Sequence, residues 1–378
     1  MLSISHLTQK VYNMPGLEDR IKEIEEEIQK TPYNKATQHH IGRLKARLAQ
    51  LRERVGKGGG KGRGMGFAIK KGGDATVALV GFPSVGKSTL LNRLTDAKSR
   101  VGGYEFTTTN IVPGIMSYKG ARIQILDLPG MITGASVGRG RGREILSIIR
   151  NVDLILILLD VFHPQQLRVI EKELYDVGIR LGQKPPGVSI KRTAKGGIRV
   201  ISGVNLKRIN ERTIREILNV NGIHSADVML REDIDEEQFI DAVMKNRVYI
   251  PSVIALNKID MMSKRELDDR LKEIGKRAIP ISAINGENLG ELRETIFRRL
   301  GIIRVYMRPR GGVVDFSEPL IVKRGSTVGD VCDRIHKGIR EKFRYAIVRG
   351  RSAKFDGQSV GIDHILEDGD ILTIVEGR

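Results

Sequence analysis

The sequence is poor in the residues that build disulfide frameworks and membrane spans. It has no tryptophan, one cysteine (Cys332) and only 4% aromatic residues. A single cysteine excludes an intramolecular disulfide framework and is typical of a reducing compartment. The most apolar run, 152–161, is too short to cross a bilayer and predicts a buried strand. Because residues 1–14 also lack the apolar stretch of a signal peptide, we expect a cytoplasmic protein.

Acidic side chains are also in deficit. The 378 residues contain 64 Lys and Arg against 45 Asp and Glu, a formal charge of +19. Such an excess favours polyphosphate surfaces through counterion release, and RNA is the abundant candidate inside cells. A charge that serves only solubility is the alternative. No lipidation signal is found, so a membrane partner is not expected, and neither is DNA.

Residues 81–88, GFPSVGKS, form the central motif of the sequence. They follow the apolar run 75–80 and lead into a helical pattern at 89–94, as in a phosphate-binding loop. In such a loop, successive N–H groups and the positive end of the new helix face phosphate oxygens. Lys87 is predicted to reach the β- and γ-phosphates, and Ser88 to hold Mg²⁺. The predicted contacts here are Gly81, Phe82, Pro83, Ser84, Val85, Gly86, Lys87, Ser88 and Thr89.

A second motif, NKID at 257–260, indicates which nucleotide is bound. Asp260 can accept two hydrogen bonds from guanine N1–H and N2–H₂, donors that adenine does not present in that arrangement. Lys258 can lay its alkyl stem along the base, and Asn257 can tie this loop to the phosphate loop. The segment after the predicted strand 278–281 is expected to close over the guanine with Ser282, Ala283 and Ile284.

Two further segments lie between these motifs in the order that a GTPase requires. The sequence DLPG at 127–130 ends the predicted strand 122–126. It would place Asp127 near Mg²⁺, through water, and a glycine N–H toward the γ-phosphate. The loop after the first helix offers a threonine hydroxyl to complete the Mg²⁺ shell. The predicted GTP contacts therefore also include Phe106, Thr107, Thr108, Asp127, Leu128, Pro129 and Gly130.

The chain resembles a known family at several of these motifs. YEFTT at 104–108, DLPG at 127–130 and the glycine-rich run 134–142 resemble the Obg-type GTPases. The phosphate loop and the overall layout are similar to the developmentally regulated GTP-binding protein branch, over essentially the whole chain. The resemblance implies that Thr108 is the Mg²⁺-binding threonine. The expected catalytic set, for hydrolysis of GTP to GDP and phosphate, is then Lys87, Thr108 and Gly130.

No residue in these motifs is an obvious candidate to orient the catalytic water. Position 131 is Met, where Ras-like GTPases keep a water-orienting glutamine, so intrinsic hydrolysis should be slow or use another device. Relatives with a hydrophobic residue here often borrow K⁺, held partly by an asparagine of the phosphate loop. This chain has Ser84 there, a weaker ligand, which leaves K⁺ activation open. The arginines at 139, 141 and 143 are either charge stabilisers or part of a basic surface loop.

We predict an α/β fold: a P-loop GTPase domain with an N-terminal helical hairpin, an inserted small α/β domain and a C-terminal ubiquitin-like β-grasp (TGS) domain. The insertion and the TGS domain are also what the resemblance implies. The expected boundaries are 1–55 for the hairpin, 56–73 for a basic Gly-rich linker, 74–164 and 247–300 for the GTPase domain, 165–246 for the insertion and 301–378 for the TGS domain.

Within these segments the patterns predict particular elements. Two apolar seams, 17–28 and 41–55, would face each other across the break at 31–34 and bury both. The insertion is expected to begin with a basic β-hairpin of 188–191 and 198–201. In the C-terminal segment, short strands would surround one helix over 328–343.

Two main functions remain open from the sequence, beside a third, a signalling GTPase with no RNA partner. One is a GTP-hydrolysing switch that acts on RNA, in particular the ribosome, in translation or assembly. The other is a slow GTP sensor that serves as a scaffold for RNA or a regulatory protein partner. Met131 favours the sensor, whereas the set of Lys87, Ser88, Thr108 and Asp127 favours turnover.

Overall fold

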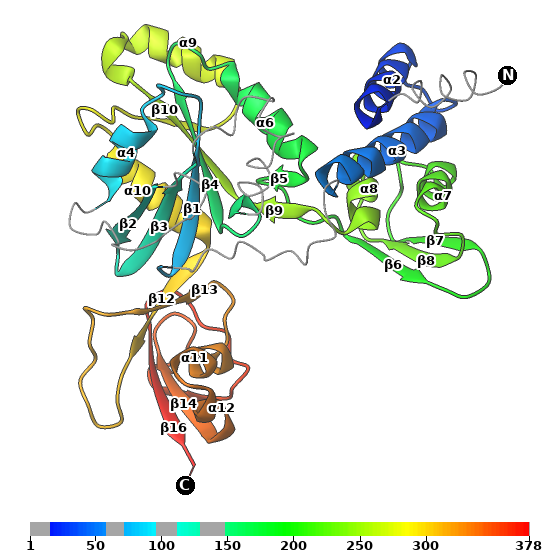
Figure 1. Ribbon diagram of the computed structural model, residues 1–378. Coiled ribbons are helices and arrows are strands. Elements are labelled where there is room, and N and C mark those ends of the chain that lie inside the picture. Colours follow the sequence, from blue (N-terminus) through cyan, green and yellow to red (C-terminus); the bar gives the residue numbers. More distant parts are fainter. Residues whose placement is uncertain (1–15, 58–71, 96–111, 129–147, 378) are drawn as a thin grey trace, which may run out of the picture. The chain divides into compact units, whose positions relative to one another are not determined.

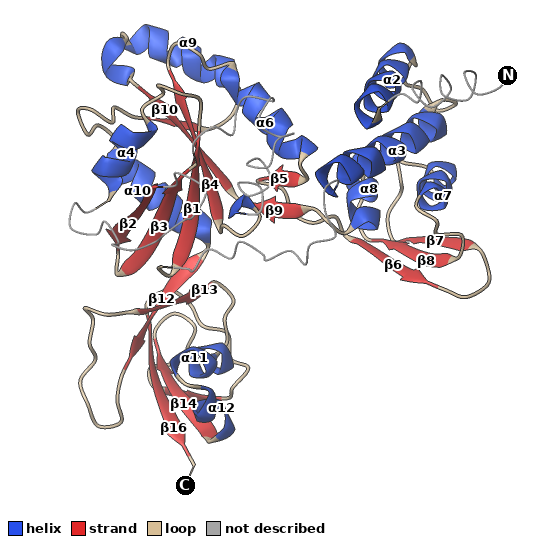
Figure 2. Cartoon of the chain, viewed as in Figure 1, coloured by secondary structure: helices blue, strands red, loops and turns tan. Residues whose placement is uncertain are grey.

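The computed structural model describes residues 16–57, 72–95, 112–128 and 148–377. They fall into two compact units, one of residues 1–65 and 173–249 and the other of residues 66–172 and 250–378. Each unit has its own sheets and helices (Figures 1 and 2). No helix in these described ranges is long and apolar enough to cross a membrane.

The second unit is built on a six-stranded sheet in the order β11-β10-β4-β1-β3-β2. Five strands run parallel, and β2 pairs antiparallel with β3 at one edge. Parallel strands are covered on both faces, which explains why every residue of β1 and β4 is buried and all but Thr76 and Asp160 are apolar. The strands are β1 (Ala75–Val80), β2 (Val112–Tyr118), β3 (Ala121–Asp127), β4 (Leu154–Asp160), β10 (Ser252–Asn257) and β11 (Ala278–Pro280).

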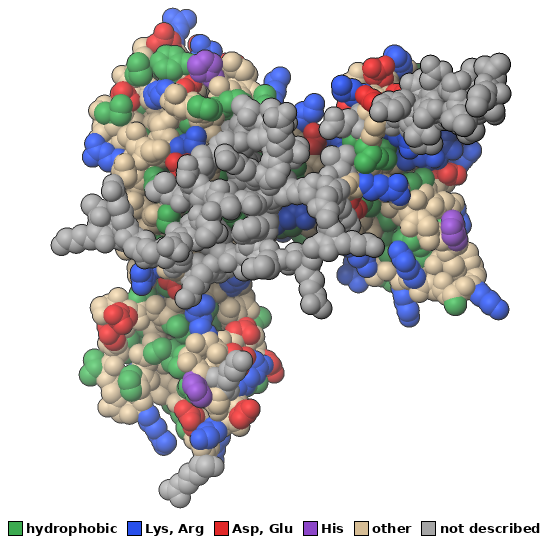
Figure 3. Space-filling model, in the orientation of Figure 1, with side chains coloured by type: hydrophobic (Ala, Val, Ile, Leu, Met, Phe, Trp, Pro, Cys, Tyr) green, Lys and Arg blue, Asp and Glu red, His purple; other side chains and the backbone are tan. Residues whose placement is uncertain are grey.

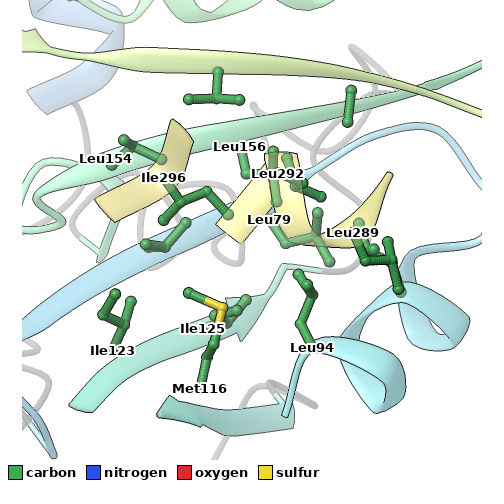
Figure 4. Packing of buried hydrophobic residues seen from close by; sticks show 14 of the residues in the cluster. Leu79, Leu94, Met116, Ile123, Ile125, Leu154, Leu156, Leu289, Leu292 and Ile296 are labelled. Carbon is green, nitrogen blue, oxygen red and sulfur yellow. The ribbon is translucent and has the colours of Figure 1, made fainter. Parts of the chain in front are cut away.

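Two helices of this unit, α4 (Lys87–Leu94) and α10 (Leu289–Leu300), bury apolar side chains against the sheet. Leu94 of α4 and Leu292 and Ile296 of α10 belong to one core cluster with side chains of the central strands. Figure 4 shows these side chains, with Leu79, Ile125 and Leu156 among the strand residues. The helices are α4 (Lys87–Leu94), α6 (Gln166–Asp176), α9 (Lys264–Ile274) and α10 (Leu289–Leu300). This packing fixes the loops at the carboxyl ends of the parallel strands.

The inserted segment contains a three-stranded sheet, and one sequence prediction about it is wrong. The order is β6-β8-β7, so the strands expected to form a β-hairpin are not neighbours. Instead β8 lies between them, antiparallel to β6 and parallel to β7. The elements are β6 (Val188–Arg192), β7 (Ile198–Ser202), α7 (Glu211–Val220), β8 (Ala226–Leu230) and α8 (Glu236–Met244), with a separate pair β5 (Ile179–Leu181) and β9 (Val248–Ile250).

The helical hairpin consists of α2 (Leu17–Lys30) and α3 (Gln38–Lys57), as predicted, but its seams do not simply bury each other. Ala46 of α3 belongs to the core of the inserted sheet and its helices. A Cβ on Gly42 would lie 2.6 Å from Thr213 Cγ2 of α7, so glycine is what lets these helices approach. Leu17 of α2 is 41% exposed. The hairpin therefore packs through α3 on the inserted segment.

The C-terminal segment is a five-stranded mixed sheet in the order β13-β12-β16-β14-β15. The single helix expected over 328–343 is two helices, because His336 adopts an extended conformation between them. Cys332 is buried in this core, and burial raises the pKa of its thiol. The elements are β12 (Ile302–Met307), β13 (Leu320–Lys323), α11 (Val328–Ile335), α12 (Lys337–Glu341), β14 (Phe343–Arg349), β15 (Gln358–Val360) and β16 (Asp370–Glu376). The predicted fold class, with its hairpin, insertion and β-grasp, is confirmed.

Candidate nucleotide site

The phosphate loop joins β1 to α4, and its two glycines are required for different reasons. Gly86 has φ +98°, and a Cβ there would lie 2.4 Å from Asn257 Nδ2. Gly81 needs no unusual φ, but its Cβ would lie 2.5 Å from the backbone oxygen of Leu158 on β4. Ser84 is also left-handed, at φ +63°. The loop is thus a tight turn pressed against β4 and against the NKID segment.

Lys87 folds back over the loop. Its Nζ donates to the backbone oxygens of Gly81 and Phe82, at 3.0 and 2.9 Å. Burial lowers the pKa of this ammonium, an effect that the nearby Asp127 carboxylate opposes. Two backbone carbonyls are weak partners for a partly desolvated cation. The side chain is therefore held at the loop in a position from which an anionic ligand would attract it.

Ser88 and Asp127 form a donor set that suits Mg²⁺. Ser88 Oγ lies 3.4 Å from Asp127 Oδ2. Asp127 Oδ1 is buried and has no hydrogen-bond partner among the described residues. Burial raises the pKa of this carboxyl despite the opposing charge of Lys87. An orphaned, desolvated carboxylate beside a hydroxyl is a site that a hydrated divalent cation would satisfy.

Asn257 connects three loops that are far apart in the sequence. Its Nδ2 donates to the backbone oxygen of Val85 at 2.8 Å, and its Oδ1 accepts from the backbone N–H of Ala283 at 2.9 Å. The side chain is only 3% exposed. The tie to the phosphate loop that the sequence predicts is therefore present. A second tie, to Ala283, links the same side chain to the segment expected over the base.

Lys258 has a partner that the sequence did not predict. Its Nζ lies 3.1 Å from Asp160 Oδ2 and 5.8 Å from the centre of the Phe162 ring. Asp160 Oδ1 accepts from the backbone N–H groups of Phe162 and His163, at 3.1 and 3.0 Å. Although burial raises it, the pKa of Asp160 is lowered on balance by hydrogen bonds from Lys258 and His163. The position of Asp160 at the end of β4, beside the end of β10, was the available signal.

The remaining base-side residues lie close in the fold but differ in exposure. Asp260 is in a short 3₁₀ turn and is exposed. Ser282 is fully buried, and its Oγ accepts from the N–H of Asn285 at 3.1 Å. Ile284 is 62% exposed, and its backbone oxygen accepts from Arg93 of α4. Pro83 and Thr89 are exposed, whereas Leu128 is buried and donates to the oxygen of Leu79 at 3.3 Å.

Several predicted residues lie outside the part of the chain that the structure describes: Phe106, Thr107, Thr108, Pro129, Gly130, Met131 and the arginines at 139, 141 and 143.

Comparison with known proteins identifies the family. Residues 76–192 match the family model described as 50S ribosome-binding GTPase, 195–302 match the C-terminal region of that domain, and 303–376 match the TGS domain. Developmentally-regulated GTP-binding protein 1 of Xenopus laevis is 46% identical over 368 residues, covering 96% of this chain and all of that one. The chain belongs to the developmentally regulated GTP-binding protein family.

Other members of the family are similar over the same length. An uncharacterised GTP-binding protein of Methanocaldococcus jannaschii is 58% identical over 377 residues, which cover 99% of this chain and 96% of that one. Among solved structures, the YchF GTPase of Schizosaccharomyces pombe matches 81% of this chain and 99% of its own at 15% identity, with a TM-score of 0.44. The match to the GTPase model and the relatives of 46% and 58% identity show that the chain is a GTP-binding protein of a P-loop family whose members in general hydrolyse GTP.

Proposed function

We propose that the protein hydrolyses GTP to GDP and phosphate with Mg²⁺ and acts as a nucleotide-dependent switch on RNA, specifically on ribosomes. The observation that carries the proposal is the double hydrogen bond of Asn257, which holds the phosphate loop and the base-side loop together. One side chain thereby makes the phosphate and base subsites a single unit. The exposure of Asp260, in the same motif, supports its proposed role in selecting guanine.

In this proposal the site residues stabilise the negative charge of the phosphates. Lys87 exchanges two backbone carbonyls for the β- and γ-phosphates, which better match its charge. Ser88 and Thr108 would hold Mg²⁺, with Asp127 contributing through water, and the bound ion would supply positive charge against the phosphate oxygens. Gly130 offers its N–H to the γ-phosphate. The segments 104–109 and 131–142 would order in the GTP state and change affinity for the partner.

The ribosomal partner is supported by charge and by family. The net charge of +19 exceeds what a switch that meets only proteins requires. In Figure 3 basic side chains gather over the part of the molecule that holds β6, β7 and β8. The matching family model is itself described as ribosome-binding. We further propose the domain boundaries given above, a cytoplasmic location and a role for K⁺ that depends on Ser84.

Single-turnover hydrolysis tests the enzymatic part of the proposal. We expect Mg²⁺-dependent phosphate release that ribosomes accelerate, and near-complete loss in Lys87→Ala. The slow-sensor alternative is favoured by Met131, which cannot orient the attacking water. No measurable turnover with either K⁺ or Na⁺, and with or without ribosomes, would establish the sensor and overturn the enzyme.

A further inference from the structure

The second unit contains a cleft lined by four arginines at the edge of the sheet away from the nucleotide site. Its volume is about 440 Å³. The arginines come from three places: one precedes β11, two end α10, and one follows β13. The lining residues are Ser252, Val253, Ile254, Arg277, Ile279, Thr295, Arg298, Arg299 and Arg324. No acidic side chain is among them.

The charges of this arginine cleft are only partly balanced within the described part of the chain. None of the four guanidinium groups forms an ion pair there, whereas the adjacent Lys276 pairs with Glu171 at 2.7 Å. The pKa of Glu294, one helical turn before Arg298, is lowered chiefly by hydrogen bonds from Lys119 at 2.6 Å and Tyr118 at 2.8 Å, and less by the charge of Arg298. All four arginines are exposed. The cleft therefore offers four guanidinium groups to an anion.

A purely structural role explains only half of the cluster. Arg298 and Arg299 lie in the last turn of α10, where cations interact favourably with the helix dipole. Arg277 and Arg324 are not at the end of a helix. Arg324 is fixed beside α10 by its own backbone, whose N–H donates to the oxygen of Gly301 at 2.7 Å. The fold thus brings a third and a fourth arginine to a helix end that already has two.

The position of the cleft separates it from the switch. Strand β10 contributes Ser252 at its start to the cleft and Asn257 at its end to the nucleotide site. Six extended residues place these ends about 17 Å apart. The remaining lining comes from Val253 and Ile254 of β10, from α10, from β11 and the residue before it, and from the turn after β13. None of it belongs to the segments proposed to order on the γ-phosphate. Its geometry should therefore be the same with GDP and with GTP.

We propose that the arginine cleft binds the phosphodiester backbone of RNA in both nucleotide states, as an anchor distinct from the state-dependent contacts. This rests on the proposed RNA-binding function. Guanidinium forks match phosphate oxygens in bidentate pairs. The lining contains no aromatic side chain, so bases have no stacking platform and recognition is of backbone rather than sequence. An acidic protein segment is the competing occupant.

The test is fluorescence anisotropy of labelled oligouridine with the full chain, over a salt series, with GDP and with a non-hydrolysable GTP analogue. The main variant is Arg277→Gln with Arg324→Gln, which spares the end of α10; Arg298→Gln with Arg299→Gln is the second. The matched control is Lys264→Gln with Arg265→Gln on α9, two exposed cations without an ion pair among the described residues. Unchanged affinity for fluorescent GDP verifies that each variant is folded.

We expect the main variant to weaken binding and to lower the slope of log K against log salt by about 1.4, at about 0.7 for each phosphate that the protein no longer neutralises. The control should keep the wild-type slope, and the change should be equal in both nucleotide states. An unchanged slope, an equal fall in the control, or absence of wild-type binding would each overturn the anchor. A main variant that loses binding of poly-glutamate but keeps binding of RNA would also overturn it, because the occupant would then be an acidic protein segment. The proposed switch is tested by a separate measurement: it fails if ribosome binding does not depend on the bound nucleotide.

Discussion

Asn257 donates to the backbone oxygen of Val85 at 2.8 Å, although 171 residues lie between them in the chain. Both residues are at most 3% exposed, so this bond is shielded from water. The same side chain also accepts from Ala283. One amide therefore sets the distance between the loop expected to hold phosphate and the loop expected to hold guanine.

Replacing Asn257 with Ala should weaken both the site and the fold. Two buried backbone groups lose their partner, which costs about 1–3 kcal/mol for each group left unsatisfied. We expect affinity for GDP and GTP to fall at least about tenfold, since 1.4 kcal/mol is a factor of ten. Fluorescent GDP titration and thermal unfolding measure the two effects. Asn285→Ala, at an exposed position of the same loop, is the control, and equal affinities for the two variants would contradict this role.

Asp160→Asn should loosen the base-side loop without unfolding it. An asparagine keeps an oxygen for the N–H groups of Phe162 and His163 but turns a donor toward Lys258. A hydrogen bond to a charged group contributes about 1.5–3 kcal/mol, part of which should appear as weaker GDP binding. His163→Ala is the control, since it leaves Lys258 paired. GDP affinity equal to wild type in Asp160→Asn would exclude Asp160 as a positioning residue.

The same carboxyl predicts a pH dependence of stability. Its pKa is lowered in the folded protein, so its ionised form stabilises the fold above the unfolded value, about 3.9, and this contribution is lost as pH falls through the folded pKa. Between about pH 5 and pH 2, the difference in unfolding free energy between wild type and Asp160→Asn should shrink as pH falls. Denaturant titrations across this range measure it. A difference that grows on acidification would show that the sign is wrong.

Asp127→Asn should stabilise the nucleotide-free protein while removing Mg²⁺-dependent turnover. The pKa of Asp127 is raised by burial, so at neutral pH the ionised carboxylate costs folding free energy that an amide does not. We expect a gain of about 0.5–2 kcal/mol, typical of relieving a strained functional site. Differential scanning calorimetry without nucleotide measures it. Asp268→Asn, an exposed carboxylate on α9, should show no gain; a destabilised Asp127→Asn would refute the assignment.

Ser84→Asn tests the proposed potassium site. Ser84 has φ +63°, a conformation that asparagine adopts more readily than most residues, so the substitution should be tolerated. The family resemblance implies that an asparagine oxygen at this position is a K⁺ ligand. We expect the ratio of hydrolysis rates in KCl and NaCl to rise above the wild-type ratio. Equal rates in the two salts for both proteins would exclude a K⁺ site at this position.

The sequence predicted the elements whose pattern is local. Strand β1 was bounded correctly at Ala75–Val80 because a parallel central strand is apolar almost without interruption. The hairpin of β6 and β7 was wrong because strand pairing is a long-range property. Their separation suits a turn, yet β8 arrives after α7 and takes the place between them. The break at His336 was equally invisible, since the apolar spacing continues through it.

At the candidate site, the motifs supplied residue types but not their partners. The spacing of Gly81, Gly86 and Lys87 predicted the loop, whereas the bonds of Lys87 to its own backbone arise only from the folded turn. Asp160 carries no motif, and only the register of β4 beside β10 brings it to Lys258. The arginine cleft brings together its four arginines, from Arg277 to Arg324, in the same way.

Whether the protein is a nucleotide-dependent switch on the ribosome is decided by sedimentation of the full-length chain with purified ribosomes at physiological salt, loaded with GDP or a non-hydrolysable GTP analogue. We predict that the analogue-bound protein sediments with ribosomes at least several-fold more than the GDP-bound protein. We also predict that Asn257→Ala abolishes this difference. Equal sedimentation in both states, or none in either, would contradict the proposed switch.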